Sequence, residues 1–456
     1  MVLELPLAIL TRRIGNEGVW PDFWKDHWIH PLFKKGQSFS PLQYRGLHLT
    51  SILSKSVEKI IACNLTSFLH GANMYGNTQW AFRPGHSCRD LLALVTGKWL
   101  LQLHDGNRVA VYFSDISGAF DRVSTEILLA KLRAVGVAET LIRFIGSYLE
   151  ARRATVLVQG CESDIYELLN MIFQGTVLGP PLWNIFFADV DQFIPESFDE
   201  QKFADDLTTY KPFPGNTSNE DIFAELEDCQ TKVHHWGEIN RATFEPTKES
   251  FAILDLTNPV AENFRMLGSW FDGKLTMNVN VEKMAGKAKS KVMALLNCRS
   301  FYSTCEMIRQ FKTHVLAHVE LNIGAFYHAV DSVLGEIDQI QISYLRKLDL
   351  SCRDAFLNFN LAPLCTRRDI AMLGLIYRCV HGLAHPELQA LFPRSHMNHD
   401  VATRLQDRRH SHQLSETRAG TRHKLLLRSI FGLARIWNRL PQELVDAPSF
   451  SKFQGG

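Results

Sequence analysis

The stretch FADDLTTY, residues 203–210, places two adjacent carboxylates, Asp205 and Asp206, between apolar and β-forming residues. Its alternation predicts a strand or a tight hairpin. Neighbouring carboxylates in such a setting repel each other and lose hydration unless a cation neutralises them. Taken alone, an Asp–Asp pair more often marks a turn, a helix cap or a solvated face. The pair gains meaning from what lies around it.

A third carboxylate ends another predicted strand. RVAVYFSDI, residues 108–116, is a run of β-branched and aromatic residues typical of a buried strand, and it closes near Asp115. If the two strand ends meet, three carboxylates gather there, which suits a hard divalent cation such as Mg²⁺. Two such ions about 3.5–4 Å apart can activate a hydroxyl and stabilise a leaving pyrophosphate. The sequence therefore predicts chemistry on the phosphates of a nucleotide.

The elements around these strands follow an α+β pattern. In chain order the sequence predicts a strand, a helix, a hairpin, a helix, the strand with the Asp pair, a helix and a strand. Ser124 is a candidate N-cap of one helix, which closes on Gly136. From about residue 278 the pattern becomes helical and basic.

The composition of the chain says more about the cellular compartment of the protein than about its binding partner. The 456-residue chain has a net charge of +1, yet residues 276–456 hold 24 Lys and Arg against 15 Asp and Glu. A basic C-terminal third fits a polyanion-binding surface, with chance asymmetry as the alternative. The nine cysteines form no CxxC pair, which indicates a reducing, intracellular compartment. No stretch is apolar enough to predict a transmembrane helix.

Several motifs resemble a known family. FSDISGAFDRV, FQGTVLGPPLWNIFFADV and FADD, in this order, are similar to three core motifs of reverse transcriptases, most of all those of the non-LTR (LINE-type) retrotransposons. Further segments agree with the same family: WIHPLFKKGQSFSPLQYRGLHLTSILSKSVEKII, TQWAFRPGHSCRDLL, FEPTKESFAIL, FRMLGSWFDGKL and ARIWNRLPQELVDAPSFSKF. The resemblance is strong over about residues 20–275 and weak beyond them.

The resemblance implies a right-hand polymerase that makes DNA on an RNA template. It divides the chain into N-terminally truncated fingers (1–107), a palm with an antiparallel sheet and the aspartates (108–275), a helical thumb (276–345) and a basic C-terminal helical region (346–456). Expected partners are an RNA template, a DNA primer and deoxynucleoside triphosphates, without a membrane. The endonuclease is expected from a missing domain or another chain. A nuclear location is plausible.

The resemblance also assigns catalytic roles. Asp115, Asp205 and Asp206 match the aspartates that hold two Mg²⁺ ions, with the backbone carbonyl of Ile116 as a further ligand. Lys248 matches a lysine proposed to protonate the leaving pyrophosphate, which is a general-acid role.

Four residues are assigned to the nucleotide. Arg45 matches a fingers arginine that pairs with the triphosphate, for which a planar guanidinium is suited. Phe120 matches an aromatic gate that excludes the 2′-hydroxyl, with plain core packing as the alternative. Gln174 and Gly175 match the loop that touches the nucleotide and template. The residue before this pair is Phe173, where the family usually has proline.

Two further segments are assigned to the nucleic acid. Leu267 and Gly268 match the turn called the primer grip. Lys283, Lys287 and Lys291 lie four residues apart, so on a helix they share one face, opposite an apolar face. We expect this helix to turn its basic face to the duplex, with a solvated surface helix as the alternative.

Two other functions remain open. One is a decayed or non-catalytic nucleic-acid-binding derivative of the same fold, and the other is a polymerase that makes RNA. The intact Asp115, Asp205 and Asp206 favour the reverse transcriptase over the first alternative. Phe120 favours it over the second.

Overall fold

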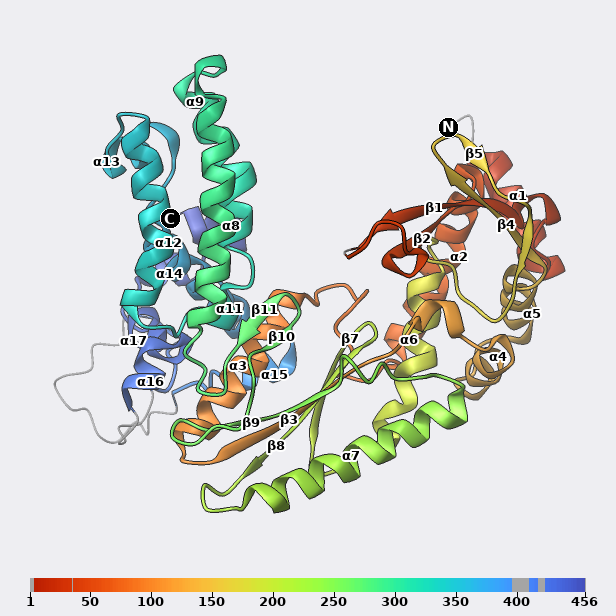
Figure 1. Cartoon of the computed structure of the whole chain (residues 1–456), viewed down its shortest axis with the longest axis horizontal. Coiled ribbons are helices and arrows are strands. Elements are labelled where there is room, and N and C mark those ends of the chain that lie inside the picture. The colour runs from red at the N-terminus through yellow and green to blue at the C-terminus, as the bar shows by residue number, and fades with distance from the viewer. Residues whose placement is uncertain (1–3, 35, 396–409, 417–422, 456) are drawn as a thin grey trace. The chain divides into compact units, whose positions relative to one another are not determined.

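The computed structural model of the chain describes residues 4–34, 36–395, 410–416 and 423–455 (Figure 1). The chain forms two compact units whose segments interleave in the sequence. The first unit comprises Met1–Phe82, Tyr112–Thr209 and Phe223–Ser250, and the second comprises Arg83–Val111, Tyr210–Ile222 and Phe251–Gly456. The division into fingers, palm, thumb and C-terminal region stays a prediction.

Helices and strands are interspersed up to residue 271, after which every element named in the described residues is a helix. The strands are β1 (Asp26–Phe33), β2 (Tyr44–Leu49), β3 (Arg108–Asp115), β4 (Arg152–Val158), β5 (Cys161–Glu162), β6 (Tyr166–Leu168), β7 (Asp199–Phe203), β8 (Asp206–Phe213), β9 (Ser250–Leu254), β10 (Phe264–Met266) and β11 (Ser269–Phe271). The helices up to β9 are α1 (Glu4–Glu17), α2 (Ile52–Gly71), α3 (Cys88–His104), α4 (Thr125–Ala134), α5 (Glu139–Leu149), α6 (Gly179–Phe187) and α7 (Asn219–Asn240). Those after β11 are α8 (Asn278–Asn297), α9 (Thr304–Phe311), α10 (Ala317–Val319), α11 (Ile323–Phe326), α12 (Asp331–Lys347), α13 (Cys352–Phe359), α14 (Leu364–Val380), α15 (Pro386–Ala390), α16 (His423–Arg428), α17 (Ala434–Trp437), α18 (Gln442–Val445) and α19 (Phe450–Gly455). The α+β class predicted from the sequence is confirmed.

The predicted strand with the Asp pair is a hairpin. β7 and β8 are joined by Ala204 and Asp205 alone, and a connection this short can only link antiparallel strands. Ala204 has a φ of +60°, the left-handed conformation that tight hairpin turns require. The sheet has the order β7-β8-β3-β9, so β8 and β3 are neighbours. β3 is buried from end to end except at Asp115, as its apolar run predicted.

A second sheet has the order β2-β1-β4-β5, and β6 also pairs with β4. β1 and β2 form an antiparallel pair, whereas β1 and β4 run parallel. Parallel strands need a long crossover connection, and the chain between β1 and β4 is long enough to provide it. The backbone amide of His48 on β2 donates to the carbonyl of Gln174, in the segment that follows β6.

The long helix α7 packs on the sheet β7-β8-β3-β9. Figure 1 shows it lying alongside β8, and the Sγ atom of Cys229 on α7 lies 3.6 Å from the hydroxyl of Thr209 on β8. Trp236, fully buried on the same helix, makes edge contacts with Phe187 of α6 and with Phe244. These contacts join α7, the sheet and α6 into one core.

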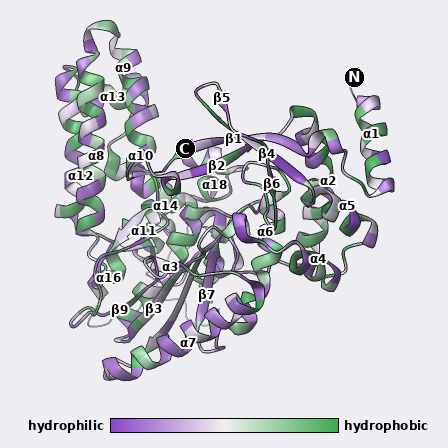
Figure 2. Ribbon diagram, turned by 45° about the vertical axis from the view of Figure 1, so that its right-hand side comes forward, coloured by the Kyte–Doolittle hydropathy of each residue, from purple (hydrophilic) through white to green (hydrophobic). Residues whose placement is uncertain are grey.

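In the second unit, α8 confirms the predicted basic helix. Val281, Ala288 and Val292 are buried on the face that packs towards α12 and β11. The lysines project from the remaining surface, and Figure 2 shows hydrophilic and hydrophobic stripes along both α8 and α12. None of the helices in the described part of the chain combines the length and the apolar content that crossing a bilayer requires.

Candidate active site

The three predicted aspartates come from adjacent strand ends. Asp115 is the last residue of β3, Asp206 is the first of the neighbouring β8, and Asp205 lies in the turn before it. The backbone at Asp115 is held by the segment after α7, since the amide of Glu245 donates to the Asp115 carbonyl at 2.9 Å. The strand order thus brings together the carboxylates that the sequence separates by about 90 residues.

The pKa values of two of these carboxylates are shifted by their neighbours. Loss of hydration and the charge of Asp115 raise the pKa of Asp205. Loss of hydration, then the charges of Asp205 and Asp115, raise the pKa of Asp206 to about 7. The side chain of Asp206 is exposed, and the two neighbouring carboxylates repel its negative charge. The site is therefore short of positive charge.

Lys248 supplies part of that charge. Its ammonium group pairs with the Asp115 carboxylate, and this contact, outweighing partial burial, raises the pKa of Lys248. The neighbouring Glu249 is buried, and its Oε1 atom accepts hydrogen bonds from the hydroxyl of Tyr112 and from Nε2 of His234 at 2.8 Å. These two partners, on β3 and α7, fix the segment that carries Lys248. The sequence assigned no role to Glu249.

In the described residues, no three His, Cys, Asp or Glu side chains are already arranged as a metal site. The ammonium group of Lys248 pairs with the carboxylate of Asp115, which is one of the expected metal ligands. The donors are nevertheless all oxygens, and they carry unneutralised charge, which is the set that Mg²⁺ prefers. Asp115, Asp205 and Asp206 therefore fit a hard divalent cation once Lys248 leaves Asp115. Ile116 is buried and bridges to Phe244, and its carbonyl stays a predicted ligand.

The predicted nucleotide residues lie beside one another. The half-buried ring of Phe120 stacks on Trp183 with the centroids 5.7 Å apart, and its carbonyl accepts from the amide of Ile172 at 2.8 Å. The amide nitrogen of the Gln174 side chain donates to Asp121 at 3.2 Å. Asp121 therefore holds the side chain of a residue that the resemblance assigns to the nucleotide.

Arg45 is exposed on β2 and faces the same region. Burial raises the pKa of Asp121 and of Asp205, and the charge of Arg45 opposes part of that rise, so the guanidinium lies near both carboxylates. Gly175 has a φ of +95°, and a Cβ atom added there would lie 2.6 Å from Cδ1 of Leu47 on β2. This close approach requires glycine and brings the Gln174–Gly175 segment against the strand that carries Arg45. Both assignments stay predictions.

The predicted nucleic-acid residues belong to the second unit. Leu267 and Gly268 form the two-residue turn between β10 and β11, with φ values of +46° and +89°. On α8, Lys287 is exposed, whereas Lys283 lies over the ring of Trp270 with its Nζ atom 3.3 Å from the centroid. The Nζ atom of Lys291 donates to the carbonyl of His314 at 2.9 Å.

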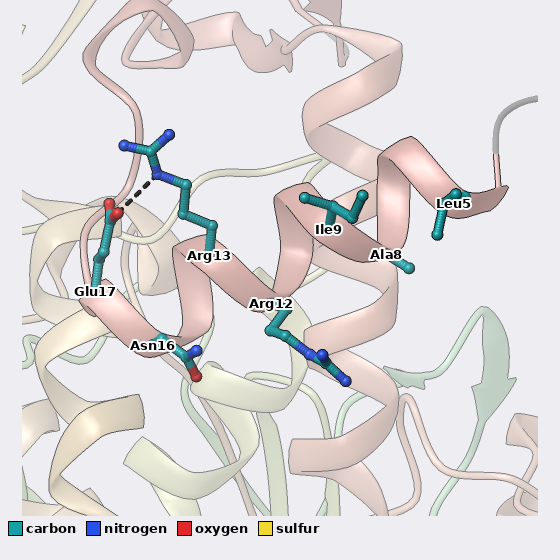
Figure 3. A pocket seen from close by; sticks show the side chains of 7 residues that line it. All are labelled: Leu5, Ala8, Ile9, Arg12, Arg13, Asn16 and Glu17. Carbon is teal, nitrogen blue, oxygen red and sulfur yellow. Dashed lines mark hydrogen bonds and ion pairs between the residues drawn. The ribbon is translucent and has the colours of Figure 1, made fainter.

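Two hollows in the described part of the chain are lined by other residues than the three carboxylates. A hollow of about 1070 Å³ in the second unit is lined mainly by α3, α11, α14 and α19. A hollow of about 550 Å³ runs along α1, where Leu5, Ile9 and Arg12 project and Arg13 pairs with Glu17 at 2.7 Å (Figure 3). All the residues that line this second hollow belong to one helix, so it is a surface groove.

Sequence reasoning missed a buried charged cluster under residues 173–178. Glu58 of α2 and Arg152 of β4 are both fully buried there. The position of Glu58 in the sequence could have revealed its burial. Glu58 stands three residues before Ile61 and seven before Leu65, which places it on the apolar face of its helix.

Comparison with known proteins agrees with this geometry. Residues 33–271 match the family described as reverse transcriptase (RNA-dependent DNA polymerase). The chain is 33% identical over 187 residues to a probable RNA-directed DNA polymerase from transposon BS of Drosophila melanogaster, covering 41% of this chain and 20% of that protein. It is 26% identical over 364 residues to the RNA-directed DNA polymerase from mobile element jockey of the same species, covering 75% and 39%.

The chain thus spans about two fifths or less of the length of these curated relatives. Among solved structures, apo telomerase from Candida tropicalis is 11% identical, with a TM-score of 0.45 over 86% of this chain and 68% of that one. A TM-score below 0.5 does not by itself establish a common fold.

Proposed function

The chain belongs to the reverse transcriptase (RNA-dependent DNA polymerase) family, and we propose that it is the polymerase part of a non-LTR retrotransposon protein. Its right-hand fold is the one that this family shares. Its substrates are a DNA primer annealed to an RNA template and deoxynucleoside triphosphates. The printed names of the relatives, RNA-directed DNA polymerases of Drosophila mobile elements, support this proposal.

The reaction joins the primer 3′-oxygen to the α-phosphorus of the nucleotide. The bond between the α-phosphorus and the bridging oxygen of the β-phosphate breaks, and pyrophosphate leaves. Asp115, Asp205 and Asp206 would hold two Mg²⁺ ions, which lower the pKa of the primer hydroxyl and stabilise the leaving oxygen. Ile116 offers its carbonyl as a further ligand.

Lys248 changes partner in this scheme. In the structure it neutralises Asp115, and it lies on a segment fixed by Glu249. If Asp115 held a metal ion instead, the ammonium of Lys248 would be free to turn towards the leaving pyrophosphate and donate a proton to it. A cationic acid there stabilises the charge that develops as the bond breaks.

Nucleotide selection falls to the residues between β2 and α6. Arg45 would pair with the triphosphate, because a planar guanidinium matches phosphate oxygens. Phe120 would exclude a 2′-hydroxyl, and Gln174 and Gly175 would contact the base pair being formed. In the second unit, the Leu267–Gly268 turn would support the primer, while Lys283, Lys287 and Lys291 would contact phosphates without reading sequence.

One observation carries the proposal. Asp115 ends β3, Asp206 begins the neighbouring β8 and Asp205 lies in the turn before it, and this placement of the three carboxylates supports the proposal. The intact carboxylates favour an active polymerase over a decayed copy, because neighbouring charges of one sign are stable together only with a cation between them. The intracellular, nuclear location and the separate source of an endonuclease belong to the same proposal.

The test is primer extension on an RNA template in Mg²⁺, with deoxynucleotides and with ribonucleotides. The proposal expects DNA synthesis that stops when EDTA removes the metal. Tight template binding without extension would favour the non-catalytic alternative. Extension with ribonucleotides alone would favour a polymerase that makes RNA.

A further inference from the structure

A buried charged cluster lies beneath residues 173–178, the segment that carries Gln174 and Gly175. Glu58 is fully buried, and its Oε2 atom accepts a hydrogen bond from the backbone amide of Val177 at 2.9 Å. Arg152 is also fully buried, and its charge acts on Glu58. The two residues come from α2 and β4, so two separate elements meet under this segment.

The same segment is held on its other side by β2. The backbone amide of His48 donates to the carbonyl of Gln174 at 2.9 Å. A side chain at Gly175 would clash with Leu47 unless the Leu47 side chain moved. Together with Glu58, these contacts fasten the backbone on both sides of Gly175.

The side chain of Phe173 is enclosed by the same cluster. The guanidinium of Arg152 lies 4.5 Å from the centre of its ring, and the rings of His27, His48 and Tyr148 lie 5.8, 5.4 and 5.9 Å away. A cation over an aromatic face attracts it electrostatically. Phe173 thus anchors the start of the segment.

The cluster is costly as a means of holding the fold together. Among the described residues, Nε and Nη2 of Arg152 make no hydrogen bond although they are buried. Buried ionic groups with unused hydrogen-bonding capacity stabilise a protein less than apolar residues of similar volume. Glu58 accepts a hydrogen bond from the amide of Val177, which an apolar residue could not do.

We propose that Glu58 and Arg152 are positioning residues for the incoming nucleotide. They fix the backbone of residues 173–178 and thereby set the affinity for deoxynucleoside triphosphates. This inference rests on the proposed function, which assigns nucleotide contact to Gln174 and Gly175. Neither charged residue touches the reacting atoms.

The effect should fall on the Michaelis constant. A misplaced nucleotide loop weakens binding in the ground state and in the transition state alike, and such a change raises KM while kcat stays the same. Loss of a hydrogen bond to a charged group of this kind corresponds to roughly a tenfold change in binding.

The experiment compares Glu58→Ala with Glu58→Gln in steady-state extension of one primer on one RNA template. Glu58→Ala should raise the KM for deoxynucleotides about tenfold and change kcat less than about twofold. Glu58→Gln keeps an oxygen acceptor for the Val177 amide and should recover most of the affinity. An unchanged KM in Glu58→Ala overturns the inference.

Leu65→Ala provides the matched control. Leu65 is buried on the same helix, about two turns further along, so this variant loses thermal stability through a buried cavity alone. Its KM should stay at the wild-type value. A KM that rises equally in Leu65→Ala would attribute the Glu58 effect to general destabilisation and overturn the inference.

Hydrogen exchange of the Val177 amide gives a second readout that needs no polymerase activity. Glu58→Ala should speed this exchange, whereas Leu65→Ala should not do so selectively. If the wild-type protein extends no primer, the proposed function fails, and the exchange result still tests the contact. Exchange at Val177 that does not respond to Glu58→Ala overturns the inference by itself.

Discussion

The substitution Gly175→Ala should impair nucleotide binding as well as folding. Gly175 has a φ of +95°, and its added Cβ atom would lie 2.6 Å from Cδ1 of Leu47. A positive φ of this kind costs a residue with a side chain about 1–3 kcal/mol. The contact with Leu47 adds steric strain that the end of that flexible side chain can partly relieve by rotating.

Part of this strain can be released if residues 173–178 move away from β2. Each 1.4 kcal/mol of affinity lost in that movement is about a tenfold rise in KM. We therefore expect a KM for deoxynucleotides about tenfold higher and a free energy of unfolding about 1–3 kcal/mol lower. The double variant with Leu47→Ala removes the clash and keeps the backbone strain, so it should recover part of the affinity.

The assay is steady-state primer extension, with urea unfolding in parallel. Gly160→Ala is the control, because Gly160 has a φ of +84° with open space around it, in the turn between β4 and β5. It should show a similar loss of stability and an unchanged KM. Equal KM values for Gly175→Ala and the wild type would refute the reasoning about this loop.

Three further predictions concern other parts of the chain. Phe120→Val should lower discrimination against ribonucleotides at least about tenfold while sparing deoxynucleotide use, and unchanged discrimination in competitive extension would reassign the ring to the core. Changing Lys283, Lys287 and Lys291 together to Gln should reduce the log–log salt slope of duplex binding by about 2–3, near 0.9 per lost phosphate contact, and an unchanged slope would place the binding surface elsewhere. Burial, then the neighbouring charges, lower the pKa of His48 to about 3, so the unfolded chain, with a pKa near 6.5, binds the proton first as pH falls. Stability should therefore drop below about pH 6.5, by about 2 kcal/mol at pH 5 from this residue, and urea unfolding of His48→Gln should show a flatter pH profile.

Periodicity and capping residues predicted most of the local structure correctly. Ser124 caps α4 by accepting from the amide of Ile127, because its side chain satisfies a donor that a helix start leaves free. The buried strand that ends at Asp115 and the hairpin around Asp205 were also predicted. Such features depend on a few neighbouring residues, which is why the sequence reveals them.

The contacts that position the site depend on distant segments and were not predictable. The pairing of Lys248 with Asp115 joins residues 133 apart, and the bond from Val177 to Glu58 joins residues 119 apart. The motif resemblance named several of these residues, but it gave no partner for Glu249 and no role for Glu58. From the sequence alone, a charged residue is expected to face the solvent.

Single-turnover extension of a DNA primer on an RNA template by the wild type and by Asp115→Asn tests the shared site of the three aspartates most directly. Asparagine keeps the size of the side chain but removes the charge on which cation binding depends. Because metal stabilisation of the transition state is worth several kcal/mol, the rate should fall at least about 10³-fold, while duplex affinity and thermal stability should stay close to wild type. An Asp115→Asn protein that extends the primer at the wild-type rate in Mg²⁺ would contradict the account.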